Sequence, residues 1–142
     1  MLMPQFGKKS LELREYLCKD LKRLVDEVIK VYDFSIVETV RGKQAQENAY
    51  EFGHSKAHYG QSAHNYHPCF ACDVYPWPLP RRMDRGLLVI DDSSAEWDKM
   101  IDAFKQKAKE LGIDITCGID FRSFKDKPHI EISDWKNRVK EI

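Results

Sequence analysis

The segment SAHNYHPCFACD, residues 62–73, and the segment DKPHIE, residues 126–131, decide how the rest of the chain is interpreted. The first segment contains His64 and ends on Asp73, and the second contains His129. Two imidazoles and one carboxylate can bind one zinc ion, and three protein ligands leave a fourth position open, as in catalytic rather than structural zinc sites. The pattern therefore predicts a catalytic zinc centre, which requires a fold that brings residues 64, 73 and 129 together.

Asp126 and Arg41 are the candidates for the chemistry around such a centre. Zinc lowers the pKa of a bound water to about 7, and Asp126, three residues before His129, can exchange a proton with that water without being a ligand. A developing oxyanion needs a cation or hydrogen-bond donors, and Arg41 follows a β-branched, apolar stretch. Each residue also has a structural explanation, such as a turn for Asp126 or a hydrogen-bonded ring for His129. Taken together they predict a zinc hydrolase.

The first segment also allows a second metal arrangement. His64, His67, Cys69 and Cys72 could form a closed zinc knuckle with two histidine and two cysteine ligands. The four ligands would have to lie within nine residues, and Cys72 and Asp73, as neighbours on a strand, would point to opposite faces. We therefore expect the two cysteines to be packing residues, whereas His67 stays a possible competing ligand.

The composition indicates a globular protein without an electrostatic preference for nucleic acid. The 142 residues are 42% hydrophobic, and 23 basic side chains balance 23 acidic ones. This balance gives no case for nucleic acid or an anionic membrane surface as a partner. No apolar run approaches the roughly 20 residues that span a bilayer, and the first ten residues lack a signal peptide's apolar region. We expect one monomeric domain over residues 1–142, made in a cytoplasm with reduced cysteines.

The order of apolar patterns predicts a small α+β domain with three main helices and an antiparallel sheet of about four short strands. Helices are expected from Ser10 to Ile29, over residues 43–52 and from Ser94 to Leu111. Strands are expected over residues 34–40, 69–75, 113–117 and 129–132, with a further extended piece over 87–90. The polar segments 54–66 and 118–127 are expected to be loops, and the zinc site is expected on a face of the sheet.

Several separated motifs make the chain resemble the family of zinc D-Ala-D-Ala carboxypeptidases and L-alanyl-D-glutamate endopeptidases, a VanY-like group that includes phage endolysins. In chain order the motifs are FGKKSL (6–11), VRGKQAQENAY (40–50), GHSK (53–56), SxHN (62–65), DVYP (73–76), GIDF (118–121) and FKDxPHxE (124–131). The chain departs from the family in the longer spacing between His64 and Asp73. It also departs in Cys69 and Cys72, which stand where small or aliphatic residues are usual.

The resemblance implies a role for each of the candidate residues. The implied zinc ligands are His64, Asp73 and His129. Asp126 takes the place of the catalytic acid/base, and Arg41 that of the arginine that polarises the substrate. Gln46 and Ser62 correspond to residues that line the site and bind substrate.

The substrate that the resemblance implies is the peptide stem of peptidoglycan, cut by hydrolysis of an amide bond. The L-Ala-D-Glu bond is favoured, and D-Ala-D-Ala carboxypeptidase activity is the alternative. A third possibility is a domain of the same fold that binds zinc without catalysis. The implied setting is a phage or prophage endolysin that is made in the host cytoplasm and acts on the cell wall during host lysis.

Overall fold

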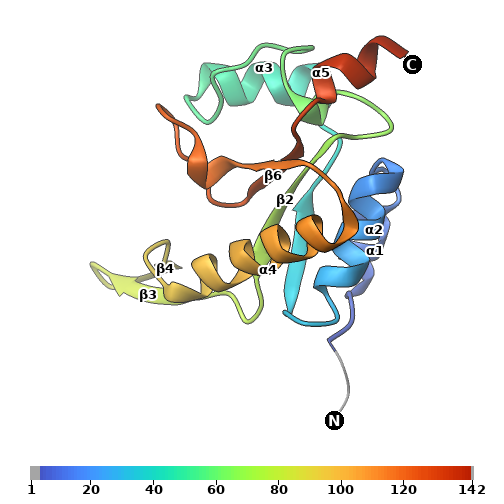
Figure 1. The fold of residues 1–142 in the computed structure, drawn as a ribbon. Coiled ribbons are helices and arrows are strands. Elements are labelled where there is room, and N and C mark those ends of the chain that lie inside the picture. Colours follow the sequence, from blue (N-terminus) through green and yellow to red (C-terminus); the bar gives the residue numbers. More distant parts are fainter. Residues whose placement is uncertain (1–3, 142) are drawn as a thin grey trace.

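A four-stranded antiparallel sheet in the order β1-β2-β6-β5 lies at the centre of the structure (Figure 1). Its strands are β1 (Phe34–Glu38), β2 (Ala71–Pro76), β6 (His129–Ile132) and β5 (Ile115–Cys117). The structure is a computed structural model that describes residues 4–141, so the ends of the expected 1–142 domain, residues 1–3 and 142, lie outside it. The sheet and its helices confirm the predicted α+β class.

The helices of the described residues are more numerous than the three main ones that the sequence predicts. They are α1 (Lys8–Arg14), α2 (Lys19–Val28), α3 (Lys43–Glu51), α4 (Ala95–Leu111) and α5 (Trp135–Arg138), with the 3₁₀ turns η1 (Ala63–Asn65), η2 (Gly118–Asp120) and η3 (Val139–Glu141). The predicted bounds of α4 are confirmed: the Ser94 hydroxyl accepts a bond from the Glu96 N–H, and Gly112 ends the helix at φ 70°, where glycine is favoured. No helix in this part of the chain is both long and apolar enough to cross a bilayer.

The prediction of one helix from Ser10 to Ile29 is wrong, because the chain breaks between α1 and α2. At the break, the Cys69 N–H donates to the Tyr16 carbonyl at 2.8 Å, and the Cys18 N–H donates to the Cys69 carbonyl at 2.9 Å. The longer segment between His64 and Asp73 is therefore fastened to the N-terminal helices. The apolar periodicity did not reveal the break, since Leu17 remains buried within it.

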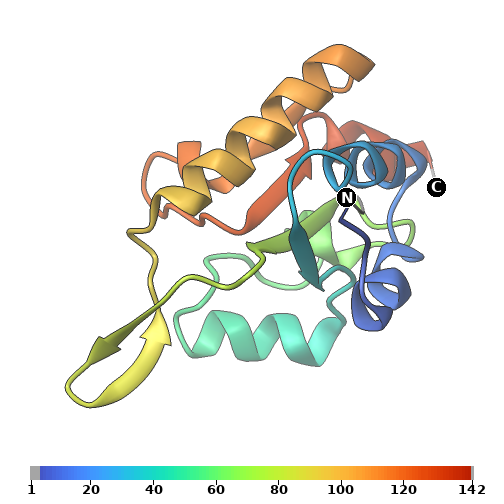
Figure 2. The same ribbon diagram turned by 90° about the horizontal axis from the view of Figure 1, so that it is seen from below.

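A hairpin of β3 (Arg81–Asp84) and β4 (Leu87–Ile90) forms a separate two-stranded sheet. Figure 2 shows it projecting from the rest of the molecule. Only an extended piece over residues 87–90 is expected from the sequence, because Arg81–Asp84 is too polar to resemble a strand. The turn is made by Arg85 and Gly86, both at positive φ, as in the tight turns that join twisted strands.

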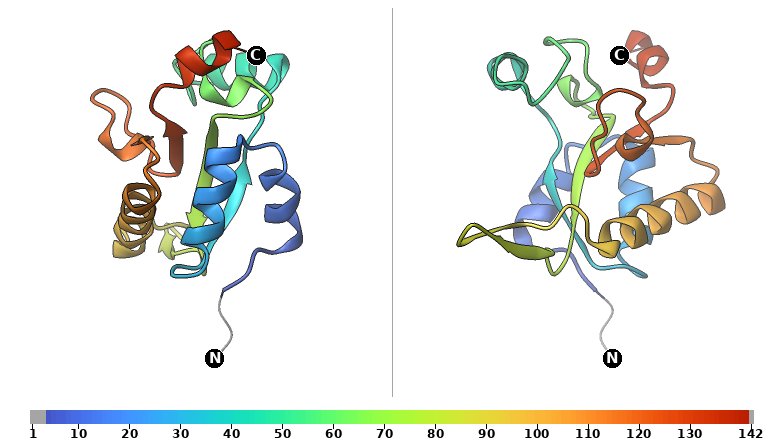
Figure 3. Two further views of the ribbon diagram at one scale, coloured as in Figure 1. Left: turned by 45° about the vertical axis from the view of Figure 1, so that its right-hand side comes forward. Right: turned by 90° about the vertical axis from the view of Figure 1, so that its left-hand side faces the viewer.

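Strand alternation separates the core from the functional face of the sheet. Cys72 and Val74 of β2 and Ile130 of β6 are fully buried in the core, to which α2 and α4 also contribute. Because successive side chains of a strand point to opposite faces, Asp73 and His129 lie on the other face. Figure 3 shows that α3, the 52–65 segment and the 118–128 segment surround this second face.

Candidate metal centre

His64, Asp73 and His129 come together as the sequence predicts, with their ligand atoms all within 4.8 Å of one another. The Nε2 atom of His64 lies 3.2 Å from Oδ1 of Asp73 and 3.2 Å from Nδ1 of His129. The Nδ1 atom of His129 lies 3.4 Å from the same Asp73 oxygen. Across residues 4–141 this is the cluster of potential ligands whose spacing could hold a metal ion.

The backbone positions the three side chains from two directions. Asp73 and His129 are directly opposed partners in the β2–β6 ladder, which brings their side chains together on one face. His64 stands on η1, which begins with a capping box: the Ser62 hydroxyl accepts a bond from the His64 N–H, and the Asn65 amide oxygen accepts one from the Ser62 N–H. The turn thereby fixes how His64 enters the site.

Hydrogen bonds on the far side of each ring set the tautomers of the two histidines. His64 donates from Nδ1 to the carbonyl oxygen of Thr39 at 2.6 Å, so the neutral ring has its lone pair on Nε2. His129 donates from Nε2 to the carboxylate of Glu131 at 2.6 Å, so its neutral ring has the lone pair on Nδ1. Trp135 donates in turn to Glu131 at 3.1 Å. Such outer partners are typical of metal-bound histidines, and both lone pairs point at Asp73, so the residues fit a divalent metal ion.

The electrostatics of the cluster agree with a cation site. Burial opposes the charge on Asp73, but hydrogen bonds from His129 and His64 outweigh it and hold the pKa of Asp73 well below its usual range. Burial likewise opposes protonation of the two histidines, but the hydrogen bond to Asp73 outweighs it and raises the pKa of both His64 and His129. The site therefore concentrates positive charge around one carboxylate, and a metal ion could replace the protons.

Arg41 is held against the site by both its backbone and its side chain. Its N–H donates to the His64 carbonyl at 2.7 Å, which ties it to the predicted ligand. Its Nε donates to Glu38 at 2.9 Å, its Nη1 donates to the Gln46 amide oxygen at 3.0 Å, and its Nη2 pairs with Glu38. With a side chain only 16% exposed, Arg41 is a preorganised cation at the edge of the centre.

Gln46 and Ser62, the two expected substrate-binding residues, occupy different places. Gln46 is fully buried behind Arg41, where its Nε2 donates to the Ser55 hydroxyl at 3.0 Å and to the Ala57 carbonyl at 2.7 Å. Ser62 lines the cavity in front of the centre. Gln46 therefore holds Arg41 and the 55–57 loop in place, and Ser62 is the one that faces the cavity.

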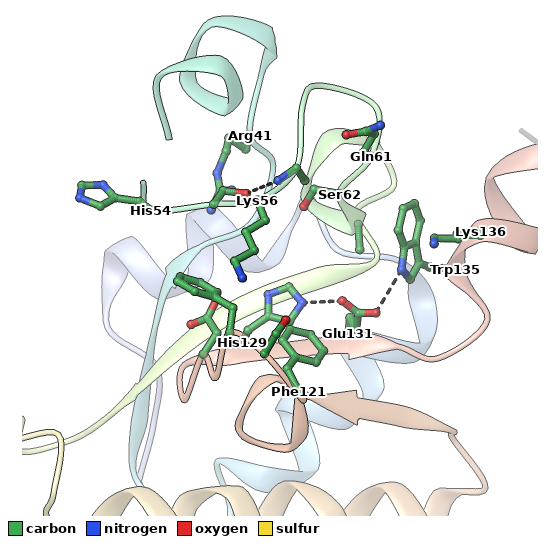
Figure 4. Close-up of a pocket in the computed structure, with 16 residues that line it drawn as sticks. Arg41, His54, Lys56, Gln61, Ser62, Phe121, His129, Glu131, Trp135 and Lys136 are labelled. Atoms are coloured by element: carbon green, nitrogen blue, oxygen red, sulfur yellow. Dashed lines mark hydrogen bonds and ion pairs between the residues drawn. The ribbon is translucent and has the colours of Figure 1, made fainter. Parts of the chain in front are cut away.

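An open cavity of about 380 Å³ lies over the centre (Figure 4). Arg41 lies on one side of it, His129 on its floor, and Trp135 on the side near α5. Lys56 extends from the 54–61 loop toward His129, with its ammonium 5.8 Å from the centre of the Phe124 ring. The lining combines aromatic rings and cations with the carboxylates of Asp126 and Glu131.

Asp126 also lines this cavity, three residues before His129. Burial and the charge of Asp73 raise the pKa of Asp126, although the positive charges of His129 and Arg41 act in the opposite sense. Its backbone N–H donates to the Gly118 carbonyl at 2.9 Å. A Cβ at residue 118 would lie 2.1 Å from the Asp126 carbonyl oxygen, so only glycine allows this close approach.

The zinc-knuckle alternative is wrong for the described residues. Cys69 and Cys72 are fully buried, and the Cys69 thiol donates to the Ala71 carbonyl at 3.2 Å. His67 is exposed, and its ring lies 5.4 Å from that of Tyr16. The two cysteines pack in the core as expected, and His67 is not part of the cluster.

Sequence reasoning assigned no role to Thr39, Glu131 and Glu38. Glu131 could have been found, because it lies two residues after His129 on a predicted strand and so shares its face. Glu38 pairs with Arg41 three residues later, which the sequence also allows. Thr39 acts through its backbone carbonyl, and a backbone acceptor carries no signal in residue type.

The comparisons with known proteins agree with this geometry. The family described as "Phage L-alanyl-D-glutamate peptidase" matches residues 2–135. Among solved structures, the crystal structure of the L-Ala D-Glu endopeptidase ChiX from Serratia marcescens is similar, with a TM-score of 0.72 and 21% sequence identity. That match covers 94% of this chain and 93% of the other, and it shows a shared fold. A search of curated proteins returns no significant match.

Proposed function

Because the chain belongs to the phage L-alanyl-D-glutamate peptidase family, we propose that it is a zinc-dependent peptidase that cleaves the L-Ala-D-Glu bond in the peptide stem of peptidoglycan. The observation that carries the proposal is the convergence of the three side chains, whose ligand atoms all lie within 4.8 Å of one another. The Nδ1 of His64 and the Nε2 of His129 are bonded to Thr39 and Glu131, so in the neutral rings the Nε2 of His64 and the Nδ1 of His129 present lone pairs beside Asp73. Two neutral imidazoles and a carboxylate are a ligand set of catalytic zinc enzymes.

The side chains around the centre suit amide hydrolysis. Zinc, when bound, would lower the pKa of a water molecule and polarise the scissile carbonyl. Asp126, with its raised pKa, would take a proton from the attacking water and deliver it to the leaving amine. Arg41 would stabilise the negative charge that develops on the carbonyl oxygen. Gln46 would keep Arg41 oriented, and Ser62 would contact the substrate.

We further propose that the enzyme acts as a phage or prophage endolysin. The family is described as a phage family, and a peptidase of the peptide stem would open the host cell wall at the end of infection. In this proposal residues 1–142 form one monomeric peptidase domain that is made in the host cytoplasm and acts on the wall.

Digestion of purified peptidoglycan by the zinc-loaded protein tests the proposal, with mass spectrometry of the released fragments. We expect peptides that begin with D-Glu. Release of single D-Ala residues would instead identify a D,D-carboxypeptidase, and no release at all would identify a non-catalytic domain.

The variant Asp126→Asn tests the mechanism in the same assay. We expect it to retain one zinc ion by metal analysis and to lose hydrolysis, because general acid–base catalysis contributes about 10²–10⁴ in rate. Asp84→Asn, at the exposed end of the β3–β4 hairpin, is the matched control and should hydrolyse at the wild-type rate. Wild-type turnover in Asp126→Asn would remove Asp126 from the mechanism.

A further inference from the structure

A second cavity of about 400 Å³ lies next to the one over the metal centre, and Asp126 lines both. The second cavity is walled by Tyr75 of β2, Ile90 of β4 and Trp97 of α4. A substrate whose scissile bond lies at Asp126 therefore has room on both sides of that bond. The main cavity holds one side, and the second cavity is open to the other.

The wall of this second cavity is built from fixed side chains. Tyr75 follows Asp73 by two residues in β2, so both lie on the functional face of the sheet. The ring of Tyr75 packs edge-on against Trp97, with the ring centres 5.5 Å apart. Trp97 is itself held by a bond of 2.9 Å from its Nε1 to the Asp91 carbonyl. A rigid aromatic wall of this kind is typical of a binding site formed before the ligand arrives.

Two lysines, Lys127 and Lys125, also line the second cavity. Lys127 donates to the backbone carbonyl of Asp92, and Lys125 donates to the carbonyl of Ile119 at 3.1 Å. Within residues 4–141 neither lysine has a carboxylate in salt-bridge contact, although hydrogen bonds from Ser93 and, to a lesser extent, the charge of Lys127 lower the pKa of Asp91. An ammonium group has three donors, so each keeps donors for a ligand after these backbone contacts.

We propose that the second cavity is a substrate subsite, in which Lys127 and Lys125 bind a carboxylate of the stem peptide and Tyr75, supported by the buried Trp97, packs against its backbone. The inference rests on the proposed function, since it assumes that the substrate is cut at Asp126. The subsite would add a determinant of substrate choice. A peptide with a free carboxylate in the second cavity would bind better than the same peptide with a carboxamide there. Asp92 lines the same cavity and would weaken that preference.

A cycle of enzyme and substrate changes tests the subsite. Synthetic stem peptides are prepared with each free carboxylate in turn converted to a carboxamide, and KM and kcat are measured for the wild type and Lys127→Gln. Lys127→Gln removes a charge-assisted hydrogen bond to the carboxylate, so we expect it to raise KM for the acidic peptide about tenfold with little change in kcat. For one of the amidated peptides the variant and the wild type should have similar KM values.

Three further variants make the outcome decisive. Lys125→Gln should show the same selectivity as Lys127→Gln, and Asp92→Asn should lower KM for the acidic peptide. Lys30→Gln, at an exposed lysine that is paired with Glu27 and does not line the cavity, is the control and should change nothing. Equal effects of Lys127→Gln on the acidic peptide and on every amidated peptide would overturn the subsite.

Failure of the subsite and failure of the proposed function give different results. If the zinc-loaded wild type cuts none of the peptides, the proposed function fails. If it cuts them and Lys127→Gln leaves KM for the acidic peptide unchanged, the subsite alone fails. Calorimetry with the uncut peptide in an Asp126→Asn background measures binding without turnover. In that background Lys127→Gln should raise the dissociation constant by the same factor as it raises KM.

Discussion

Asp73 and His129 are directly opposed residues of β2 and β6, with Oδ1 and Nδ1 3.4 Å apart. The antiparallel register sets this relationship, because it holds the backbones of the two residues opposite each other in two central strands. His64 joins them from η1 through its Nε2. Two of the three proposed ligands are thus fixed by the sheet, and the third is fixed by a short turn.

The metal-free protein should lose stability as the pH rises, while zinc should stabilise it more strongly. The folded pKa values of His64 and His129 are raised above the ordinary value of about 6.5. Their contribution to folding is therefore complete below pH about 6.5 and is lost as the pH rises through the raised values. Zinc competes with the same protons, so the increase in melting temperature on adding zinc should grow across this window.

Circular dichroism melts with chelator and with excess zinc, from pH 6 upward, measure both trends. His129→Ala is the control, because it removes one proposed ligand and should flatten the zinc effect at every pH. A zinc-induced shift in melting temperature that is the same at all pH values would contradict the assignment of these histidines as ligands.

The three proposed ligands could be predicted from sequence because their residue types are those that bind zinc. Strand alternation accounts for Asp73 and His129, whereas the position of His64 depends on η1. The break between α1 and α2 could not be predicted, because it depends on hydrogen bonds between Cys69 and the backbone of residues 16 and 18. Such tertiary pairing overrides a continuous apolar period. The β3–β4 hairpin was not predicted for another reason. Both of its strands are largely exposed, so no buried face gives β3 an alternating pattern of apolar residues.

The position of Gln46 shows a second limit of sequence reasoning. A sequence motif can identify Gln46 as part of the site, but only the structure shows whether its side chain is exposed to the cavity or buried behind it. Gln46 is fully buried and bonded to Arg41, so it acts on the site from behind. Nothing in the residue type distinguishes an amide that faces a cavity from one that supports its wall.

Glu131 should tune the affinity for metal although it is not a ligand. Its carboxylate accepts the Nε2 proton of His129, and removal of such outer partners typically lowers metal affinity about 10–100-fold. We expect that loss for Glu131→Ala and a smaller one for Glu131→Gln, which can still accept the bond. Trp135→Phe removes only the donor to Glu131 and should have the least effect.

Competition with a zinc-sensitive dye measures the affinity of each of these variants. The order of the three effects is the informative result, because general destabilisation would not follow it. If Glu131→Ala binds zinc as tightly as the wild type, Glu131 does not orient His129.

Gly118→Ala should displace Asp126 from the cavity. The added Cβ would lie 2.1 Å from the Asp126 carbonyl oxygen and 2.9 Å from the Cβ of His129, so the 118–128 segment must move. Overpacking of this kind costs about 1–3 kcal/mol, and we expect urea unfolding to show it, together with a fall in hydrolysis. Gly7→Ala is the control, because nothing lies within 4 Å of a Cβ there. Equal stability and activity of the two variants would show that the close approach is unimportant.

Arg41→Ala should lower kcat while leaving zinc binding intact. Loss of one donor to a developing oxyanion typically costs about 10²–10³ in kcat, and Arg41 is held in place for that task by Glu38 and Gln46. The bond from its backbone N–H to the His64 carbonyl does not depend on the side chain, so the ligand should stay in position. Arg41→Lys should recover only part of the rate, because an ammonium lacks the planar fork of donors.

Steady-state kinetics on a stem peptide and metal analysis together separate these effects. Arg23→Ala, which removes an exposed arginine of α2, controls for the loss of one positive charge and should leave kcat unchanged. If Arg41→Ala instead raises KM at constant kcat, Arg41 binds the ground state of the substrate equally well. In that case its charge contributes to recognition of the peptide, and other groups in the cavity must stabilise the transition state. Lys56, which extends toward His129 in Figure 4, is one candidate.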